Sequence, residues 1–145
     1  MDRIGRLFFA WISAALFVAL FAVIGCVPLP AEPPCPEGTE QYDEYRLFFG
    51  RNIGDAEGVS DDDWRTFLAD TITPRFPDGL SVFDAAGQWR NSQGEIVRER
   101  SKMVLILAVP DSDAAQKLDE ITEEYKRRFS QESVLLVTDS ACVKF

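Results

Sequence analysis

The sequence contains no histidine, and it has only three cysteines and two methionines among its 145 residues. Histidine is the usual proton carrier at neutral pH and the commonest metal ligand, so the chain lacks the residue type most often used for either role. Its absence also excludes Ser-His-Asp and Cys-His catalytic arrangements. Glycine-rich phosphate loops, G-x-S-x-G motifs and Cys-x-x-Cys pairs are missing as well. We therefore expect no metal and no cofactor, and an enzymatic role stays open without being favoured.

Positive charge is also scarce, because the chain has 15 Lys and Arg against 24 Asp and Glu, which gives a net charge of −9. Binding to nucleic acid without sequence preference depends on clustered basic side chains that replace phosphate counterions. Docking to anionic lipid by charge needs the same feature. The balance therefore argues against a nucleic-acid partner.

Charged side chains are absent from one long segment, the apolar run of residues 7–24 that follows Arg3 and Arg6. The run ends in Val23-Ile24-Gly25-Cys26, which resembles the lipobox of bacterial lipoproteins. We predict a signal peptide over residues 1–25 and lipidation, including palmitate, at Cys26. The alternative is a transmembrane helix, since the run is close to the shortest length that spans a bilayer. Both interpretations place the rest of the chain outside the cytoplasm.

Residues 26–43 begin with the lipidated cysteine and are rich in proline, so we predict an extended tether between the anchor and a domain over residues 44–145. If Cys26 carries lipid, Cys35 and Cys142 are left as an even pair that can form a disulfide in an oxidising compartment. The alternative is two free thiols. Position 27 is Val, and the lipoprotein resemblance implies an outer-membrane protein facing the periplasm when this position is not Asp in a Gram-negative cell.

The remaining pattern alternates strands and helices. Ser60 and Asp63 form a capping box before one helix, and Pro74 ends it. The second helix carries apolar residues at helical spacing. The predicted elements are strand 44–51, helix 60–73, strand 80–90, strand 95–109, helix 112–130 and strand 133–138, with a possible extension over 141–145.

This order predicts an α+β, ferredoxin-like βαββαβ fold, in which a four-stranded antiparallel sheet has order 4-1-3-2 and two helices on one face. The first strand then lies beside the last, which brings Cys35 and Cys142 to one corner. Several strands are apolar on both faces, as in residues 103–109. We expect either a homodimer or a ligand pocket to cover the second face.

Three polar stretches hold the candidate site residues. Arg75 lies between prolines and either binds an anion or contacts Asp78 or a helix C-terminus. The first stretch, residues 73–80, contains this arginine. The second, residues 87–89 with 95–102, is either an exposed hairpin or a polar site in an apolar groove. The third, residues 125–134, either closes a turn or hydrogen-bonds to the first. The binding candidates are Arg75, Trp89, Ser101, Lys102, Gln131 and Glu132, and Glu99 is a weak candidate for an acid or base.

The segments FFGR, TPRFPDGL, GQW, ERSK and YKRRFSQESVL, taken together, resemble a bacterial family known as domain of unknown function 3574. The resemblance covers residues 44–145. It implies a small and often exported protein without established activity, so it assigns no catalytic or binding role. The residues that match its motifs are Arg51, Arg75, Phe76, Pro77, Gly79, Trp89, Glu99, Ser101, Lys102, Gln131, Glu132 and Ser133.

Two main functions are consistent with these features. The first is a non-catalytic, membrane-anchored lipoprotein of the cell envelope, whose dimeric domain binds another envelope protein or a small ligand. The second is a small dimeric α+β-barrel enzyme that acts on an anionic small molecule, with Glu99 as acid or base and Arg75 and Lys102 as anion ligands. A purely structural envelope component is a third interpretation, which the sequence does not separate from the first.

Overall fold

The computed structural model describes residues 34–53, 56–110 and 112–145. All of them except residue 34 belong to the compact unit Cys35–Phe145. Within these ranges no helix has the length and apolar character needed to cross a membrane. The signal peptide, the lipidation at Cys26 and most of the tether lie outside the described residues and stay predictions.

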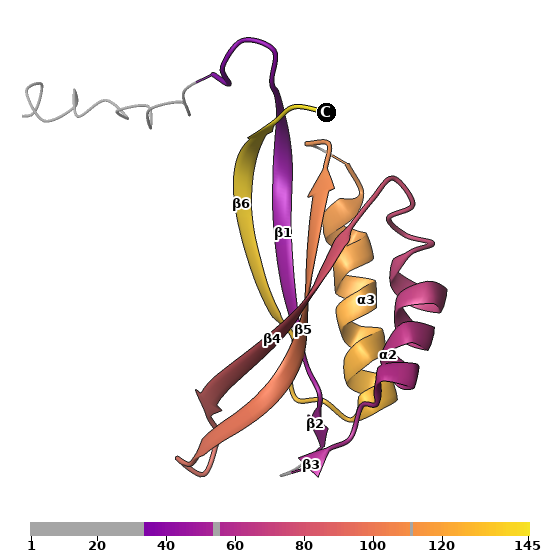
Figure 1. The fold of residues 1–145 in the computed structure, drawn as a ribbon, viewed down its shortest axis with the longest axis vertical. Helices are drawn as coiled ribbons and strands as arrows, with labels where there is room; N and C mark the ends of the chain where they lie inside the picture. Colours follow the sequence, from indigo (N-terminus) through magenta and orange to yellow (C-terminus); the bar gives the residue numbers. More distant parts are fainter. Residues whose placement is uncertain (1–33, 54–55, 111) are drawn as a thin grey trace, which may run out of the picture. The chain divides into compact units, whose positions relative to one another are not determined.

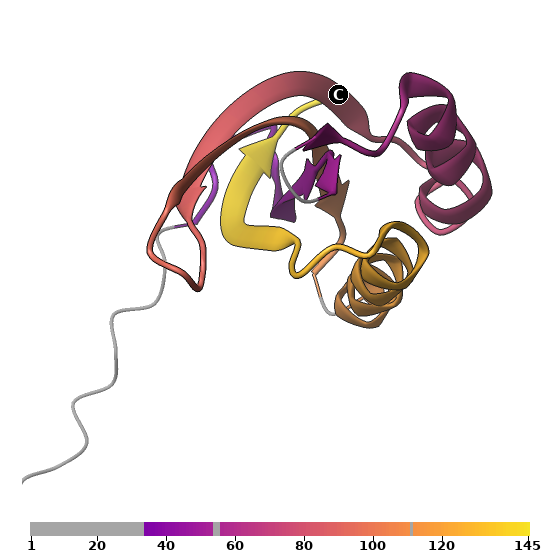
Figure 2. The same cartoon turned by 90° about the horizontal axis from the view of Figure 1, so that it is seen from below.

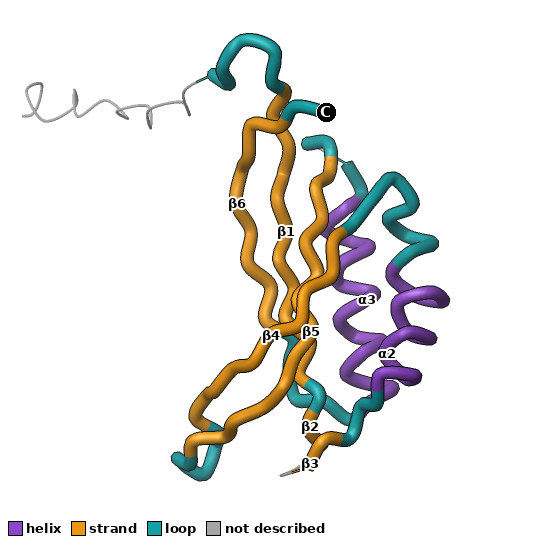
Figure 3. The backbone as a smooth tube through the Cα atoms, in the orientation of Figure 1, coloured by secondary structure: helices purple, strands orange, loops and turns teal. Residues whose placement is uncertain are grey.

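The elements follow the predicted order, with one small addition. They are β1 (Glu40–Gly50), β2 (Asn52–Ile53), β3 (Ala56–Glu57), α2 (Asp61–Phe67), η1 (Leu68–Ile72), β4 (Ser81–Arg90), β5 (Ile96–Ala108), α3 (Ala114–Phe129) and β6 (Leu135–Val143). The main sheet has the order β4-β5-β1-β6 and is antiparallel throughout. The predicted α+β, ferredoxin-like fold and its strand order are thus confirmed (Figures 1 and 3).

Both helices lie on one face of the sheet, as the view in Figure 2 shows. The core between the layers is an aromatic cluster of Phe49, Trp64, Phe67, Tyr125 and Phe129. Phe49 and Phe67 both contact Tyr125, with ring centroids 4.8 and 5.0 Å apart. Edge-to-face pairs of this kind add to the energy of burying the rings. The cluster therefore fixes both helices against β1.

The first helix begins as predicted and ends differently. The Ser60 hydroxyl accepts a hydrogen bond from the Asp63 backbone N–H, and the Asp63 carboxylate accepts one from the Ser60 backbone N–H, which completes the capping box. The α-helix stops at Phe67 and continues as the π-helical turn η1, which no sequence pattern indicated. Ile72, at the end of this turn, belongs to the same buried core cluster as Phe67.

The sheet is longer at one end than the sequence suggested. β1 begins at Glu40, not at residue 44, and β6 runs to Val143 as one strand. Glu40 pairs with Val143 and Gln41 with Cys142. Each segment therefore satisfies the backbone groups of the other, so residues 40–43 belong to the sheet although the sequence placed them in the tether.

The face of the sheet opposite the helices, called the open face below, is rich in apolar side chains. Phe83, Trp89 and Leu135 are 47%, 40% and 59% exposed there. Exposed apolar patches on a sheet usually mark an interaction or ligand site. The sheet-to-sheet homodimer stays a prediction.

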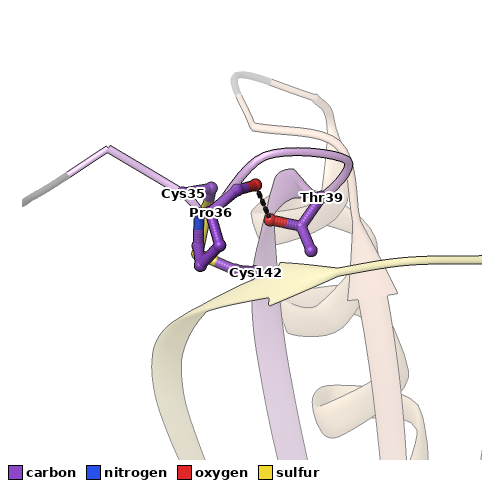
Figure 4. The surroundings of a disulfide bond; sticks show 4 residues. All are labelled: Cys35, Pro36, Thr39 and Cys142. Carbon is purple, nitrogen blue, oxygen red and sulfur yellow. Dashed lines mark hydrogen bonds between the residues drawn. A yellow bond between two sulfur atoms is a disulfide. The ribbon is translucent and has the colours of Figure 1, made fainter.

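The disulfide between Cys35 and Cys142 is present, which confirms the predicted pair (Figure 4). Its Cα atoms are 5.5 Å apart. Thr39 donates a hydrogen bond to the carbonyl of Pro36, which turns the chain from Cys35 into β1. The bond thus joins the start of the domain to the end of β6.

Replacing Cys35 and Cys142 with serine should lower the free energy of unfolding. The bond closes a loop with a sequence separation of 107 residues, for which the chain-entropy model gives about 4–5 kcal/mol. Urea unfolding of the oxidised and the double-variant proteins measures the difference. The wild type with reductant is the control and should match the variant. Equal midpoints for oxidised and variant protein would contradict the prediction.

Candidate functional site

The alternation of side chains along β5 decides which candidates can meet. Val104 and Ile106 are buried under the helices, so Lys102 shares their face. Glu99 and Ser101, one step out of phase, lie on the open face. Glu99 and Lys102 therefore point to opposite sides of the sheet, and they cannot form one binding site.

A cavity of about 500 Å³ lies on the open face beside the end of β1. It collects residues from β1, the β4–β5 hairpin and the connection between α3 and β6. Among the candidates chosen from the sequence, those that line it are Trp89, Glu99, Ser101, Gln131 and Glu132. Arg75 and Lys102 are not part of it. The structure thus joins the second and third polar stretches and leaves out the first.

Glu99 is one of the two acidic residues that line this cavity. The indole Nε1 of Trp89 donates a hydrogen bond of 3.1 Å to one carboxylate oxygen. The backbone N–H of Asn52 donates to the other oxygen at 3.5 Å. Two donors from different elements therefore orient the Glu99 carboxylate. The residues that line the cavity include no basic side chain that could neutralise it.

One of two nearby glycines leaves room for the Glu99 side chain. Gly87 pairs with Glu99 across β4 and β5, but a Cβ atom there would meet nothing within 4 Å. A Cβ atom on Gly50 would come within 2.6 Å of the Glu99 carboxylate. A glycine inside a strand often marks such a close approach. Gly50 is a residue of the candidate site that the sequence analysis missed, and its place at the end of an apolar strand was the available signal.

The core holds Gly50 in place from the other side. The Tyr125 hydroxyl donates a hydrogen bond of 2.7 Å to the Gly50 carbonyl. Burial raises the pKa of Tyr125, so the phenol stays protonated and keeps donating. The aromatic cluster thereby positions the backbone against which Glu99 rests.

Gln131 connects the end of α3 to the same segment. Ser130 adopts the left-handed conformation that ends the helix, with φ of 52°. The Gln131 side chain then donates to the carbonyls of Asn52 at 2.6 Å and Phe129 at 3.3 Å. Gln131 thus positions the residue whose N–H contacts Glu99. It does not bond to the stretch around Arg75, which was one of the two expectations.

Arg75 lies at the opposite end of the domain. Its Nη1 donates to the carbonyl of Thr71 at 2.8 Å, and its Nε contacts Glu120 at 3.2 Å. The connection from η1 to β4 and the connection from α3 to β6 lie at opposite ends of the helical layer, because the two helices run antiparallel (Figure 1). The sequence left open whether Arg75 binds an anion or contacts Asp78 or a helix C-terminus. In the structure it contacts Thr71, at the C-terminal end of η1.

Lys102 takes part in a charged cluster on the helix side. It contacts Asp84 at 2.5 Å and Asp61 at 3.4 Å. Lys102 holds the pKa of the Asp84 carboxyl below its usual value through this hydrogen bond and its charge. Arg51, which is 1% exposed, contacts the same Asp61 at 3.1 Å and donates to the carbonyl of Val59 at 2.9 Å. These contacts secure the segment between β1 and α2.

The cavity favours positive charge electrostatically. Glu99 and Glu132 line it, and neither lysine nor arginine does. Trp89 and Phe48 supply aromatic surface, which attracts cations through the ring face. Within the described ranges no group of His, Cys, Asp and Glu is arranged to hold a metal ion. The arrangement is suited to an organic cation.

Comparison with known proteins identifies the family. The family described as "Protein of unknown function (DUF3574)" matches residues 44–145. The chain belongs to this family. No curated protein matches the DUF3574 chain significantly.

Two solved structures share its fold. A phage SAM lyase in complex with S-methyl-5'-thioadenosine is 20% identical to the DUF3574 chain, with a TM-score of 0.57, and the match covers 80% of this chain and 97% of that one. The phage SAM lyase in the apo state is 21% identical, with a TM-score of 0.53, and the match covers 79% and 98%. At these identities the likeness shows the fold alone.

Replacing Gly50 with alanine should displace the Glu99 carboxylate. The clash involves the end of a flexible side chain, so we expect Glu99 to swing away at a cost below about 1 kcal/mol. The hydrogen bond from Trp89 is then lost, and the indole N–H resonance of Trp89 should shift in an NMR spectrum. Gly87→Ala is the matched control, because Gly87 lines the same cavity and has open space around it. An unmoved resonance in Gly50→Ala would argue against the contact.

Proposed function

We propose that this DUF3574 protein is an exported, lipid-anchored protein of the cell envelope that binds a cationic small molecule. The ligand lies in the open-face cavity, with its charge against Glu99 and a flat or apolar part against Trp89. The anchor is Cys26, and the protein faces the periplasm from the outer membrane in a Gram-negative cell. The domain acts as a binding module.

The Glu99 carboxylate is the observation that carries the ligand part. It is oriented by Trp89 and by the Asn52 backbone before any ligand arrives. A cation that replaces water beside this carboxylate meets two acidic side chains and no basic one. Cavities with few, well-placed polar groups and much apolar surface are typical small-molecule sites. An anionic ligand would instead meet repulsion, since Arg75 and Lys102 are engaged elsewhere.

The disulfide supports the export part. Cys35 and Cys142 are bonded, and structural disulfides persist in oxidising compartments outside the cytoplasm. Cys26 is then the cysteine left over, at the end of an apolar run that resembles a lipoprotein signal.

S-adenosylmethionine is a suitable probe because it carries a sulfonium charge beside a flat adenine, and the fold is shared with a lyase for this compound. Its thioether counterpart, S-adenosylhomocysteine, lacks that charge. We expect calorimetry to show tighter binding of the sulfonium compound. Glu99→Gln should weaken it by about tenfold, or ~1.4 kcal/mol, and remove the preference.

Asp84→Asn is the control, because Asp84 is a carboxylate on the neighbouring strand that faces the helices. It should leave the affinity unchanged. Equal binding of the two compounds by the wild type, or unchanged binding by Glu99→Gln, would rule out the cation site.

The shared fold favours a second candidate, an enzyme that acts on such a cation with Glu99 as the proton-transferring group. In this candidate Glu99 takes a proton from water, and the water oxygen bonds to the γ-carbon of the methionine part of S-adenosylmethionine as the bond from that carbon to sulfur breaks. The products are S-methyl-5'-thioadenosine and homoserine. Chromatography of the reaction mixture measures the product. Release by the wild type and by Asp84→Asn, with none from Glu99→Gln, supports the enzyme. Binding without release leaves the binding module as the function.

A further inference from the structure

The end of the domain at which the chain enters has an unusual surface. The tether end, as we call it, consists of the disulfide, the C-terminal residue Phe145 and the end of β5 at Val109. Phe145 is 92% exposed and Val109 is 61% exposed, the two highest values among the exposed large hydrophobic residues of the described ranges. Both line a second cavity of about 730 Å³, which also includes Tyr42, Leu107 and Phe76.

This apolar surface lies where the anchor holds the domain. The disulfide joins Cys35 to Cys142, which lies in β6, the last strand. From Cys26 to Cys35 the chain has nine peptide units, which reach at most about 32 Å when fully extended. The tether end therefore cannot move far from the bilayer, whether Cys26 is lipidated or the apolar run before it spans the membrane.

The Glu99 cavity lies at the other end of the sheet. Gly50 and Glu40 mark the two ends of β1, which spans about 35 Å at the usual rise of a strand. Glu99 rests against Gly50. A contact between the tether end and the bilayer would thus hold the cavity away from the membrane, open to solutes.

We propose that the tether end rests on the lipid bilayer, with Phe145 and Val109 inserted at its surface. The contact depends on apolar insertion and not on attraction to anionic lipid. The basic residues that line this cavity, Lys117 and Arg75, already contact Asp113 and Glu120, and aromatic side chains favour the membrane–water interface. This surface rests on the proposed anchor and is independent of the ligand in the Glu99 cavity.

Quenching by brominated lipid tests the contact in the full-length, anchored protein in phosphatidylcholine vesicles. Trp11→Phe removes the tryptophan of the apolar run, and Phe145→Trp adds a probe at the tether end. Ile96→Trp is the matched control. Ile96 is 48% exposed and begins β5, the strand whose other end leads to Val109 at the tether end. Both probe positions are exposed, so neither substitution disturbs the core.

We expect brominated lipid to remove most of the emission added by Phe145→Trp and to leave that of Ile96→Trp unchanged. Emission from Phe145→Trp that resists quenching would overturn the contact. Equal quenching of both probes would overturn it too, because the domain would then lie flat. A protein that does not float with the vesicles overturns the anchor as well, whereas the calorimetry on Glu99 tests the ligand separately.

Discussion

The packing of the aromatic cluster against the end of β1 is the interaction on which the rest of the molecule depends. Phe49 lies in the middle of this cluster and contacts Trp64, Phe67 and Tyr125. Because Phe49 is fixed, the next residue, Gly50, is fixed as well, and Tyr125 secures its carbonyl. The open-face cavity is built on that backbone. The core and the candidate site are therefore two sides of one short segment.

Placing both helices on one face has a second consequence. Residues on the covered face form the core and a charged cluster of Arg51, Lys102, Asp61 and Asp84. Residues on the other face stay accessible and include exposed aromatic and aliphatic side chains. A carboxylate surrounded by apolar surface attracts a cation more strongly than one in water, because water screens the charge less there. A ligand can therefore bind on the open face without displacing side chains of the core.

Much of the fold could be predicted, and less of the site. Ser60 and Asp63 marked the start of α2 because capping is a local interaction. The π-helical end of that helix could not be predicted, since it depends on how Ile72 reaches the core. The grouping of Trp89 with Glu99 was expected from one hairpin. The approach of Gln131 to Asn52 was not, because it joins residues far apart in the chain.

The sequence by itself determined the strand and helix order, and hence the topology that pairs Cys35 with Cys142. These features follow from local periodicity and from the chirality of crossovers, which any chain with this pattern obeys. Only the tertiary structure decided which polar residues share a site. The alternation of side chains along β5 already places Glu99 and Lys102 on opposite faces, but only the structure shows which face is open and that Glu99 meets Asn52 across strands. That outcome depends on strand register and packing, which residue order alone does not specify.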